Sequence, residues 1–119
     1  DNVKIQNHVS VFEGVIIEDD VFVGPSTTFT NVLNPRSTIS RKDEFKKTIL
    51  KKGCSTGANS TIICGNTINQ YALIGAGSVV SKDVEKNTIV TGNPALYKSK
   101  ICKCGNCYGK HYTVCDKCK

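Results

Sequence analysis

The sequence predicts an all-β fold, a parallel β-helix of hexapeptide repeats, from three observations. The first is a column of large apolar residues with a period of six. Its members are Ile5, Val11, Ile17, Val23 and Phe29. The second is a parallel column two residues earlier: Val3, Val9, Val15, Val21 and Thr27. The third is that polar residues fill the alternate positions and the corners, so both columns share one strand face. A run of ordinary amphipathic strands would drift in spacing, which this stretch does not do.

Composition supports one folded domain with a small appendage. Charged residues are 22% of the chain and hydrophobic residues 39%, as in globular rather than disordered proteins. No apolar run approaches the roughly 20 residues that span a bilayer, and the start shows no signal-peptide pattern, so we expect a cytoplasmic protein without membrane insertion. The chain begins without Met inside a repeat, which predicts further coils before it.

The net charge of +6 belongs to the end of the chain. Residues 1–95 carry ten Lys and Arg against nine Asp and Glu, whereas residues 96–119 carry six Lys against Asp116 alone. No platform of aromatic and basic residues accompanies this charge, which argues against nucleic acid as the partner.

The repeat is interrupted once. Residues 32–47 have no six-residue column, contain a proline and are heavily charged. We expect them to leave the coil at one corner as an excursion loop, because the step from Phe29 to Leu50 is 21 residues and not a multiple of six. A binding loop and a tolerated surface insertion are both compatible with this length, and long loops in compact domains favour function.

The columns resume after the excursion and define two more coils. The large column is Leu50, Thr56, Ile62, Ile68, Ile74 and Val80, and the inner column is Thr48, Cys54, Ser60, Asn66, Ala72 and Ser78. Thr56 stands at a large aliphatic position and Asn66 at a small one, so both strain the pattern. Glycines at or near the corners suit positive φ; they are Gly53, Gly57, Gly65, Gly75 and Gly77. Residues 1–95 form the expected β-helix domain, and residues 96–119 a Cys-rich tail.

Three blocks of this sequence resemble the hexapeptide-repeat acyltransferases. They are NVKIQNHVSVFEGV, FTNVLNPRS and GCSTGANSTIICG, followed by IGAGSVV and a GNPA corner. Within that family the chain looks like the UDP-2-acetamido-3-amino-2,3-dideoxy-glucuronate N-acetyltransferases, which serve surface-polysaccharide synthesis. The resemblance implies a left-handed coil, a homotrimer and acetyl-CoA bound in the clefts between neighbouring prisms.

The resemblance also implies the site residues. Asn31 falls where these enzymes have an asparagine facing the reacting amino group, and Asn34, Arg36 and Ser37 belong to the same loop motif. The coenzyme is expected to run along Gly75, Ala76 and the corner at Gly92, Asn93, Pro94 and Ala95. These enzymes have several hexads before the point where this chain starts.

Acetyl transfer to an amine calls for a way to remove a proton, most often a histidine base. His8 lies at a corner of the first coil and His111 in the tail, so neither is well placed. Without a histidine, positioning by Asn31 would carry much of the rate. Glu13, next to Phe12, is a reserve candidate for the base, and an outward corner carboxylate is its alternative reading.

Basic residues gather in and after the excursion, where both expected ligands would bring phosphates. Arg36 is the first candidate for the sugar's carboxylate or diphosphate, because a guanidinium suits bidentate contact. Arg41 and Lys42 are weaker candidates. Lys51 and Lys52 are more simply a solvated basic edge.

Five of the seven cysteines lie in the tail. Cys104-x2-Cys107 and Cys115-x2-Cys118 have the paired spacing of a tetrahedral, structural Zn²⁺ site. Cys102 is a fifth candidate, and the sequence does not decide between Cys102 and Cys107. In the coils, Cys54 falls in the inner column and is expected to be core rather than a nucleophile. No base accompanies Cys64.

The sequence also bears on other functions of this fold. A γ-class carbonic anhydrase would need three histidines near the repeats, and an O-acetyl or serine transferase would keep a histidine in the coils. An ice-binding prism would show outward arrays of threonine, whereas the outward positions here are mixed. Succinyl transfer, or a zinc-ribbon binding module that uses the tail alone, remains open.

Overall fold

The computed structural model describes residues 1–31, 36–39 and 46–105, which form short strands and no helix long and apolar enough to cross a membrane. The strands are β1 (Lys4–Ile5), β2 (Val15–Ile17), β3 (Phe22–Val23), β4 (Thr28–Phe29), β5 (Thr48–Leu50), β6 (Ser55–Thr56), β7 (Thr61–Ile62), β8 (Thr67–Ile68), β9 (Leu73–Ile74), β10 (Val79–Val80), β11 (Thr88–Thr91) and β12 (Leu96–Lys100).

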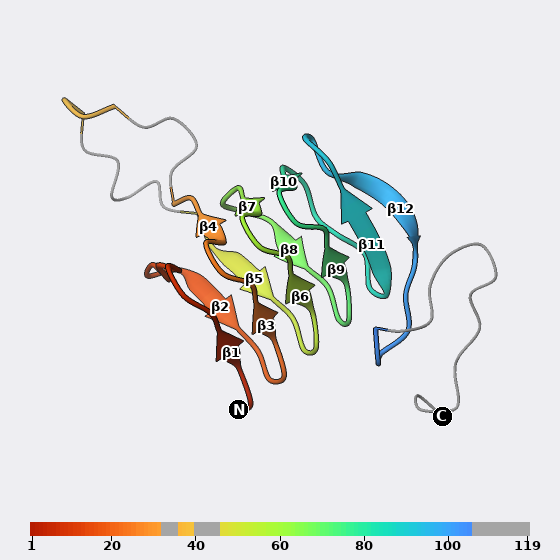
Figure 1. Cartoon of the computed structure of the whole chain (residues 1–119). Helices are drawn as coiled ribbons and strands as arrows, with labels where there is room; N and C mark the ends of the chain where they lie inside the picture. Colours follow the sequence, from red (N-terminus) through yellow and green to blue (C-terminus); the bar gives the residue numbers. More distant parts are fainter. Residues whose placement is uncertain (32–35, 40–45, 106–119) are drawn as a thin grey trace.

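These strands wind into a three-sided prism (Figure 1). The first sheet, side A, has the order β1-β3-β6-β9-β11-β12; side B is β4-β7-β10 and side C is β2-β5-β8. All pairings are parallel except that of β11 with β12. Strand partners stand 18 residues apart at Ser55↔Leu73 but 33 apart at Phe22↔Ser55, so the excursion adds 15 residues to one coil. The predicted parallel β-helix is confirmed.

The corners carry one residue of positive φ in each hexad. Before the excursion these are Asn2, His8, Gly14, Asp20 and Ser26, and after it Gly53, Asn59, Gly65, Tyr71 and Gly77. Residues other than glycine therefore fill six of these ten positions, at a modest conformational cost that Asn and Asp bear best. The spacing of six confirms the hexad period independently of the apolar columns.

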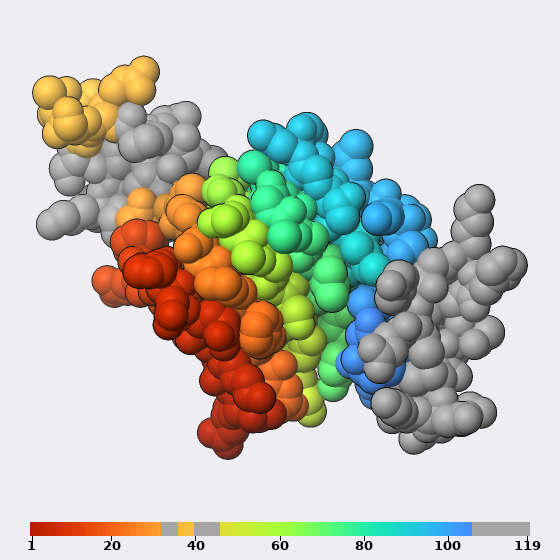
Figure 2. Space-filling model, in the orientation of Figure 1, coloured from red at the N-terminus to blue at the C-terminus, as the bar shows by residue number. Residues whose placement is uncertain are grey.

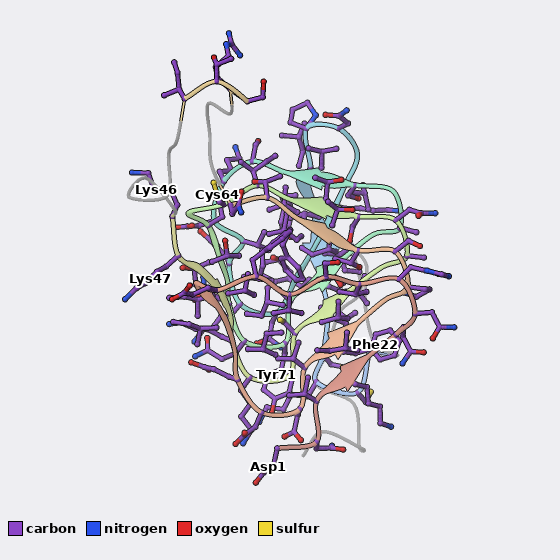
Figure 3. All side chains as sticks on the ribbon, turned by 90° about the vertical axis from the view of Figure 1, so that its left-hand side faces the viewer. Asp1, Phe22, Lys46, Lys47, Cys64 and Tyr71 are labelled. Carbon is purple, nitrogen blue, oxygen red and sulfur yellow. The ribbon has the colours of Figure 1, made fainter. Side chains whose placement is uncertain are left out.

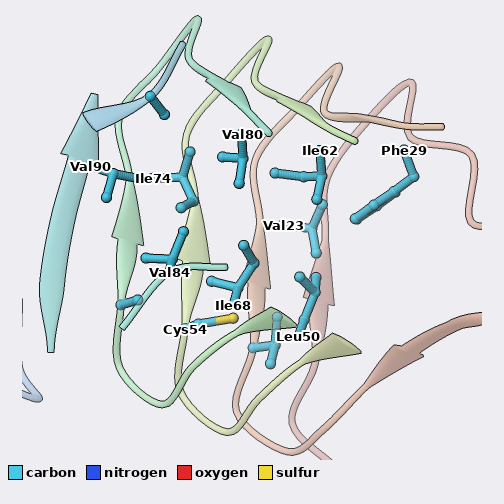
Figure 4. Packing of buried hydrophobic residues seen from close by; sticks show 13 residues of the cluster. Val23, Phe29, Leu50, Cys54, Ile62, Ile68, Ile74, Val80, Val84 and Val90 are labelled. Atoms are coloured by element: carbon cyan, nitrogen blue, oxygen red, sulfur yellow. The ribbon is translucent and has the colours of Figure 1, made fainter. Parts of the chain in front are cut away.

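The predicted columns form the core. Figure 4 shows Val23, Phe29, Leu50, Ile62, Ile68, Ile74 and Val80 pointing into the prism, and each is at most 2% exposed. Ile5 and Val11 differ, with exposed fractions of 44% and 43%, and Ile17 is only partly buried. They lie in the first described coil, which packs against another coil on one side only, so their inward positions are not covered.

The two positions that strain the pattern are stabilised by hydrogen bonds. The Thr56 hydroxyl, inside the prism, lies 3.1 Å from that of Thr27 and accepts a bond from the Gly24 N–H. Thr27 in turn donates to the Gly24 carbonyl at 2.8 Å. Asn66 is only partly buried and donates its amide to the Ile63 carbonyl, three residues back, at 2.8 Å. A buried polar group is tolerated when it has such a partner.

Thr48 and Thr56 offer a matched test of this interior. Both are buried, but the Thr48 hydroxyl has no hydrogen-bond partner among the residues that the structure describes. Thr48→Val should therefore raise the free energy of unfolding by about 1 kcal/mol, since it removes an unsatisfied polar group without changing shape. Thr56→Val should lower it by about 1 kcal/mol. Urea unfolding at equal m-value measures both, and equal effects of the two substitutions would contradict this account.

The end of the prism is closed by a hairpin. Strand partners at Leu73↔Ile89 stand only 16 residues apart, so the last coil is two residues shorter than the others. β12 then turns back antiparallel along β11 and becomes the edge of side A. Residues 96–100, which the sequence places at the start of the tail, thus belong to side A, together with β1, β3, β6, β9 and β11 (Figure 2 shows the continuous surface).

Candidate active site

The base of the excursion builds one edge of the prism. The chain leaves side B after β4 and enters side C at β5, and the Lys46 N–H donates to the Asn31 carbonyl at 3.3 Å, which closes the base of the loop. The neighbouring Thr30 hydroxyl accepts a bond from the Cys64 N–H at 2.9 Å. Asn31 is partly buried, and Figure 3 shows Lys46 and Cys64 at the same corner. We call this corner the B–C edge.

Glu13 lies on the B–C edge of the preceding coil, next to Gly14. A Cβ built at Gly14 would lie 3.8 Å from the Lys46 carbonyl oxygen, and one built at Gly65 would lie 3.4 Å from Lys46 Cβ. Lys46 is therefore stacked between the two corner glycines. The structure thus brings Glu13 and Asn31 to one edge, as a shared site requires. Glu13 is exposed, as an outward corner carboxylate would be, and its role as a base stays a prediction.

Two further predicted substrate residues lie in a turn of the excursion. Arg36 and Ser37 are exposed, and the Ile39 N–H donates to the Arg36 carbonyl at 3.2 Å. Asn34, Arg41 and Lys42 lie outside the described residues. The exposed Lys46 and Lys47, which belong to the basic run of the excursion, add positive charge at the base of the loop (Figure 3). The register of β5, which starts directly after Lys47, is the signal that places them.

The predicted coenzyme residues occupy another edge, where side A turns into side B. A groove of about 330 Å³ lies on it, lined by Phe22, Ser55, Thr56, Gly57, Leu73, Ile74, Gly75 and Ala76. Gly75 is confined there, because an added Cβ would lie 2.7 Å from Thr91 Cγ2. The outward Phe22 and Leu73 supply apolar walls that the sequence analysis did not single out. Phe22 is a large apolar residue at an outward position between two inward residues, and this departure from the pattern could have marked it as a groove residue.

The GNPA corner wraps around β10. The Gly92 N–H donates to the Ser78 hydroxyl at 3.1 Å, and the Ala95 N–H to the Val79 carbonyl at 2.8 Å. Gly92, Asn93 and Pro94 are exposed, and the Asn93–Pro94 peptide bond is cis. Ala95 is buried and lines a second cavity of about 310 Å³ together with Lys82, Asp83, Val84, Glu85, Thr88, Val90 and Tyr97. The two halves of the predicted coenzyme site therefore adjoin different cavities.

Acceptor and coenzyme residues lie on different edges of one prism. Asn31 and Glu13 are on the B–C edge, whereas Gly75 and Ala76 are on the A–B edge. In Figure 3 the labelled Cys64 of the first edge and Phe22 of the coenzyme groove stand apart, on different sides of the coil. A single prism therefore does not juxtapose the two sets.

Cys54 is core, as predicted. It is fully buried, and burial raises the pKa of its thiol to about 12 from an ordinary value of 9.0, with the charge of Glu18 as a smaller cause in the same direction. A thiol that stays protonated in this way is a poor nucleophile. Cys64 is also buried, and its backbone N–H rather than its sulfur makes the described contact with Thr30.

The raised pKa of Cys54 predicts a pH dependence of stability. Ionisation is easier in the unfolded chain, so this contribution is intact below about pH 9 and is lost as the pH rises toward about 12. Cys54→Ala should cost about 1 kcal/mol at neutral pH through the lost sulfur, and the difference from wild type should shrink above pH 9. Denaturation under reducing conditions across this range measures it, and a constant difference would contradict the assignment.

Only part of the predicted metal site can be placed. Cys102 is buried, Cys104 is exposed, and their sulfurs lie 3.0 Å apart. Cys107, Cys115 and Cys118 lie outside the described residues. Within residues 1–31, 36–39 and 46–105, no three His, Cys, Asp or Glu side chains converge as a metal-binding group.

Comparison with known proteins supports the resemblance. No model of a protein family matches the chain. Over 62 residues it is 50% identical to a dTDP-3-amino-3,6-dideoxy-alpha-D-galactopyranose 3-N-acetyltransferase of Aneurinibacillus thermoaerophilus, a match that covers 52% of this chain and 32% of that protein. A maltose O-acetyltransferase from Clostridium difficile 630 has a similar structure, with a TM-score of 0.73 and 26% identity over 84% of this chain and 56% of that one.

A second solved structure carries the coenzyme. It is a hexapeptide-repeat acetyltransferase from Vibrio cholerae O1 biovar eltor complexed with acetyl coenzyme A, at a TM-score of 0.58 and 27% identity over 83% of this chain and 60% of that one. The present chain spans about a third to a half of the length of the first curated relatives it matches. The homologues and structural neighbours of this chain are hexapeptide-repeat acetyltransferases, and they include an N-acetyltransferase of a dTDP-linked amino sugar.

Proposed function

We propose that this chain is the catalytic prism of an acetyl-CoA-dependent N-acetyltransferase that acts on a nucleotide-linked amino sugar. The observation that carries the proposal is the partly buried Asn31 at the base of the excursion, on a fold whose relatives transfer acetyl groups. The 50% identical relative acts, by its name, on a 3-amino sugar carried by dTDP. The sequence resemblance favours UDP and a 3-amino-2-acetamido uronic acid, made in the cytoplasm for surface polysaccharide.

The proposed chemistry is attack of a neutral amine on the thioester carbonyl. The Asn31 side-chain oxygen accepts a hydrogen bond from the amine and turns its lone pair toward the carbonyl carbon. The new C–N bond forms as the C–S bond breaks, and the amine proton ends on the departing coenzyme thiolate directly or through water. A backbone N–H supports the developing oxyanion. No histidine side chain takes part, so positioning supplies most of the rate, which is within the range that orientation can give.

Charge at the B–C edge suits this acceptor. Lys46 and Lys47 are exposed cations at the base of the excursion, and Arg36 is an exposed cation in its turn. A uronic acid brings one carboxylate and a nucleoside diphosphate brings two phosphates, so the sugar nucleotide complements them. Asn34, Ser37, Arg41 and Lys42 remain proposed contacts from the loop motif.

The proposed assembly is a homotrimer whose active sites lie between prisms. The B–C edge with Asn31 and the A–B edge with the apolar groove are separated within one chain, and a symmetric ring would bring the first edge of one copy to the second edge of the next. Acetyl-CoA would then lie along Gly75 and Ala76, with its thioester directed at the neighbour's Asn31.

A coupled thiol-release assay tests the proposal. The chain is incubated with acetyl-CoA and a panel of UDP- and dTDP-linked amino sugars, each paired with the analogue that carries a hydroxyl in place of the amine. Release of thiol with an amino sugar, together with mass gain of one acetyl group on that sugar, is the expected result. Binding of acetyl-CoA in titration calorimetry without turnover of any amine would contradict it.

O-acetyl transfer is the second candidate, because the maltose O-acetyltransferase shares the fold at a TM-score of 0.73. A hydroxyl is a weaker nucleophile than an amine and depends more on a general base. The described B–C edge offers only Glu13 for that role. The hydroxyl analogues in the same panel distinguish the two activities.

A further inference from the structure

Phe12 is an exposed aromatic residue at the B–C edge. Its side chain is 42% exposed, and the Val15 N–H donates to its carbonyl at 3.1 Å, so the backbone turns the corner directly after it. Single exposed hydrophobic residues are common on protein surfaces, so exposure alone does not mark a site. The feature that marks Phe12 is its position beside Asn31.

The pairing of the first two coils sets this position. Ser10 pairs in parallel with Thr28. The same register, carried two residues toward the edge, places Phe12 beside Thr30, the residue before Asn31. Neighbouring strands lie about 4.8 Å apart, so the backbone of Phe12 is about one strand spacing from this segment. That spacing is comparable with the width of a pyranose ring.

The next coil extends this row of outward residues. β4 and β7 pair in parallel, so Thr30 and Ile63, which follow these strands, are also neighbours. Thr30 therefore lies between two larger apolar side chains, the exposed Phe12 and the partly buried Ile63. Its hydroxyl is engaged within the fold, because it accepts the Cys64 N–H at 2.9 Å. This part of the edge thus presents an aromatic ring next to the amide of Asn31.

An aromatic ring next to an amide suits an amino sugar. A pyranose chair carries its hydroxyl, amino and acetamido groups around its rim, and its two faces expose mainly C–H bonds. An aromatic side chain packs on such a face while directed hydrogen bonds hold the rim. The exposed Lys46 and Lys47 lie at the same edge and suit the diphosphate of a sugar nucleotide.

We propose that Phe12 binds the acceptor by packing on a face of its sugar ring and so directs the amine toward Asn31. This inference rests on the proposed function and names a contact for its substrate. Packing removes apolar surface of both rings from water, which stabilises the complex. It also fixes the tilt of the sugar, and alignment of this kind carries much of the rate in a site without a histidine base.

The nucleobase is another part of the same ligand that suits an aromatic ring. It is joined to the sugar through the ribose and the diphosphate, so it lies farther from the amine than the sugar ring does. Phe12 is only about one strand spacing from the segment that holds Asn31, which favours the sugar ring as its partner.

Steady-state kinetics of matched variants test this contact. The acceptor is UDP-2-acetamido-3-amino-2,3-dideoxy-glucuronate or dTDP-3-amino-3,6-dideoxy-galactopyranose, whichever the wild type acetylates. Phe12→Ala should lower kcat/KM for the sugar nucleotide about 10- to 100-fold, as loss of a buried aromatic contact does, and leave the KM for acetyl-CoA unchanged. Phe12→Tyr keeps the ring and should stay close to wild type. Ile16→Ala is the control, since Ile16 is 44% exposed on the same coil but lies in β2 on side C.

The free nucleoside diphosphate separates the sugar from the base. UDP or dTDP lacks the sugar ring, so its inhibition constant should be equal for wild type and Phe12→Ala. Saturation-transfer NMR of the bound sugar nucleotide should show strong transfer to the protons of the sugar ring, and Phe12→Ala should lose most of it. Size-exclusion chromatography should show the same assembly for both proteins.

Three results would each overturn the inference. They are unchanged kcat/KM in Phe12→Ala, equally weakened inhibition by the free diphosphate, and dissociation of the assembly in Phe12→Ala. A wild type that binds a sugar nucleotide through its sugar ring but acetylates none would overturn the proposed function alone. A wild type to which neither sugar nucleotide binds would overturn both.

Discussion

Asn31→Ala is expected to lower kcat/KM for the amino sugar by about 100-fold or more, because it removes the group that orients the amine. The loss should fall mainly on kcat, since the coenzyme groove at Gly75 and Ala76 lies on another edge and stays intact. The backbone bond from the Lys46 N–H to the Asn31 carbonyl does not involve the side chain, so folding should be unaffected. Steady-state kinetics with acetyl-CoA saturating measures the effect.

Gln70→Ala is the matched control. It removes an amide side chain at the C–A corner, next to Tyr71 and away from both proposed substrate edges. Its kinetics should equal those of wild type. If Asn31→Ala also kept full kcat/KM, the active site would not be at the base of the excursion. Unfolding curves of both variants show whether a loss of activity reflects a loss of folded protein.

Gly57→Ala is expected to destabilise the prism by about 3 kcal/mol, through overpacking between coils. An added Cβ would lie 2.5 Å from the Ala76 N and 2.8 Å from both Ala76 Cα and the Ile74 carbonyl oxygen. These are backbone atoms of the next coil and cannot turn aside as a side chain would. Relief would require the coils to move apart, which would weaken the parallel pairing of β6 with β9.

Gly77→Ala is its matched control, because the two glycines are needed for different reasons. Gly77 has φ +71° and no atom within 4 Å of an added Cβ, so alanine there meets only backbone strain of about 1 kcal/mol. Denaturant unfolding should give a clearly lower free energy of unfolding for Gly57→Ala than for Gly77→Ala. If Gly77→Ala were the less stable variant, the close contact between coils at Gly57 would not be what excludes a side chain there.

The fold could be predicted because each hexad shows the repeat pattern within six consecutive residues. Each strand has the same inward pair, so Leu50, Ile62 and Ile68 could be assigned to the core without knowledge of their neighbours. The columns resume at Leu50 but out of phase with the first block, because Phe29 and Leu50 stand 21 residues apart, which is not a multiple of six. The left-handed winding was predicted from the family resemblance alone, because the spacing of the columns is the same for a left-handed and a right-handed coil.

Burial at the ends could not be predicted in this way. Ile5 and Val11 obey the period but are exposed, because burial depends on a coil at either side and not on the residue's own position. Conversely, Thr56 breaks the apolar column and is buried, because Thr27 in the adjacent coil offers a hydroxyl at 3.1 Å. Thr27 and Thr56 are 29 residues apart in the sequence, so the sequence alone does not show that their hydroxyls meet.

The candidate site was predicted only as separate pieces. Asn31 and the Gly75–Ala76 corner carry their own motifs, but the edge on which each lies depends on the three-sided winding. Cys102 and Cys107 stay alternative predictions for a metal ligand, because Cys107 lies outside the described residues.

The most direct test of the proposed shared active site is complementation between two inactive variants. Asn31→Ala damages the B–C edge, and Ala76→Glu places a carboxylate in the A–B groove, where it would repel the coenzyme's phosphates. The two chains are co-expressed with different affinity tags, and assemblies that contain both are purified in sequence. In a mixed trimer one of the three interfaces keeps both edges intact, so we predict about one third of wild-type activity. Mixed assemblies as inactive as the two single variants would contradict a site shared between neighbouring chains.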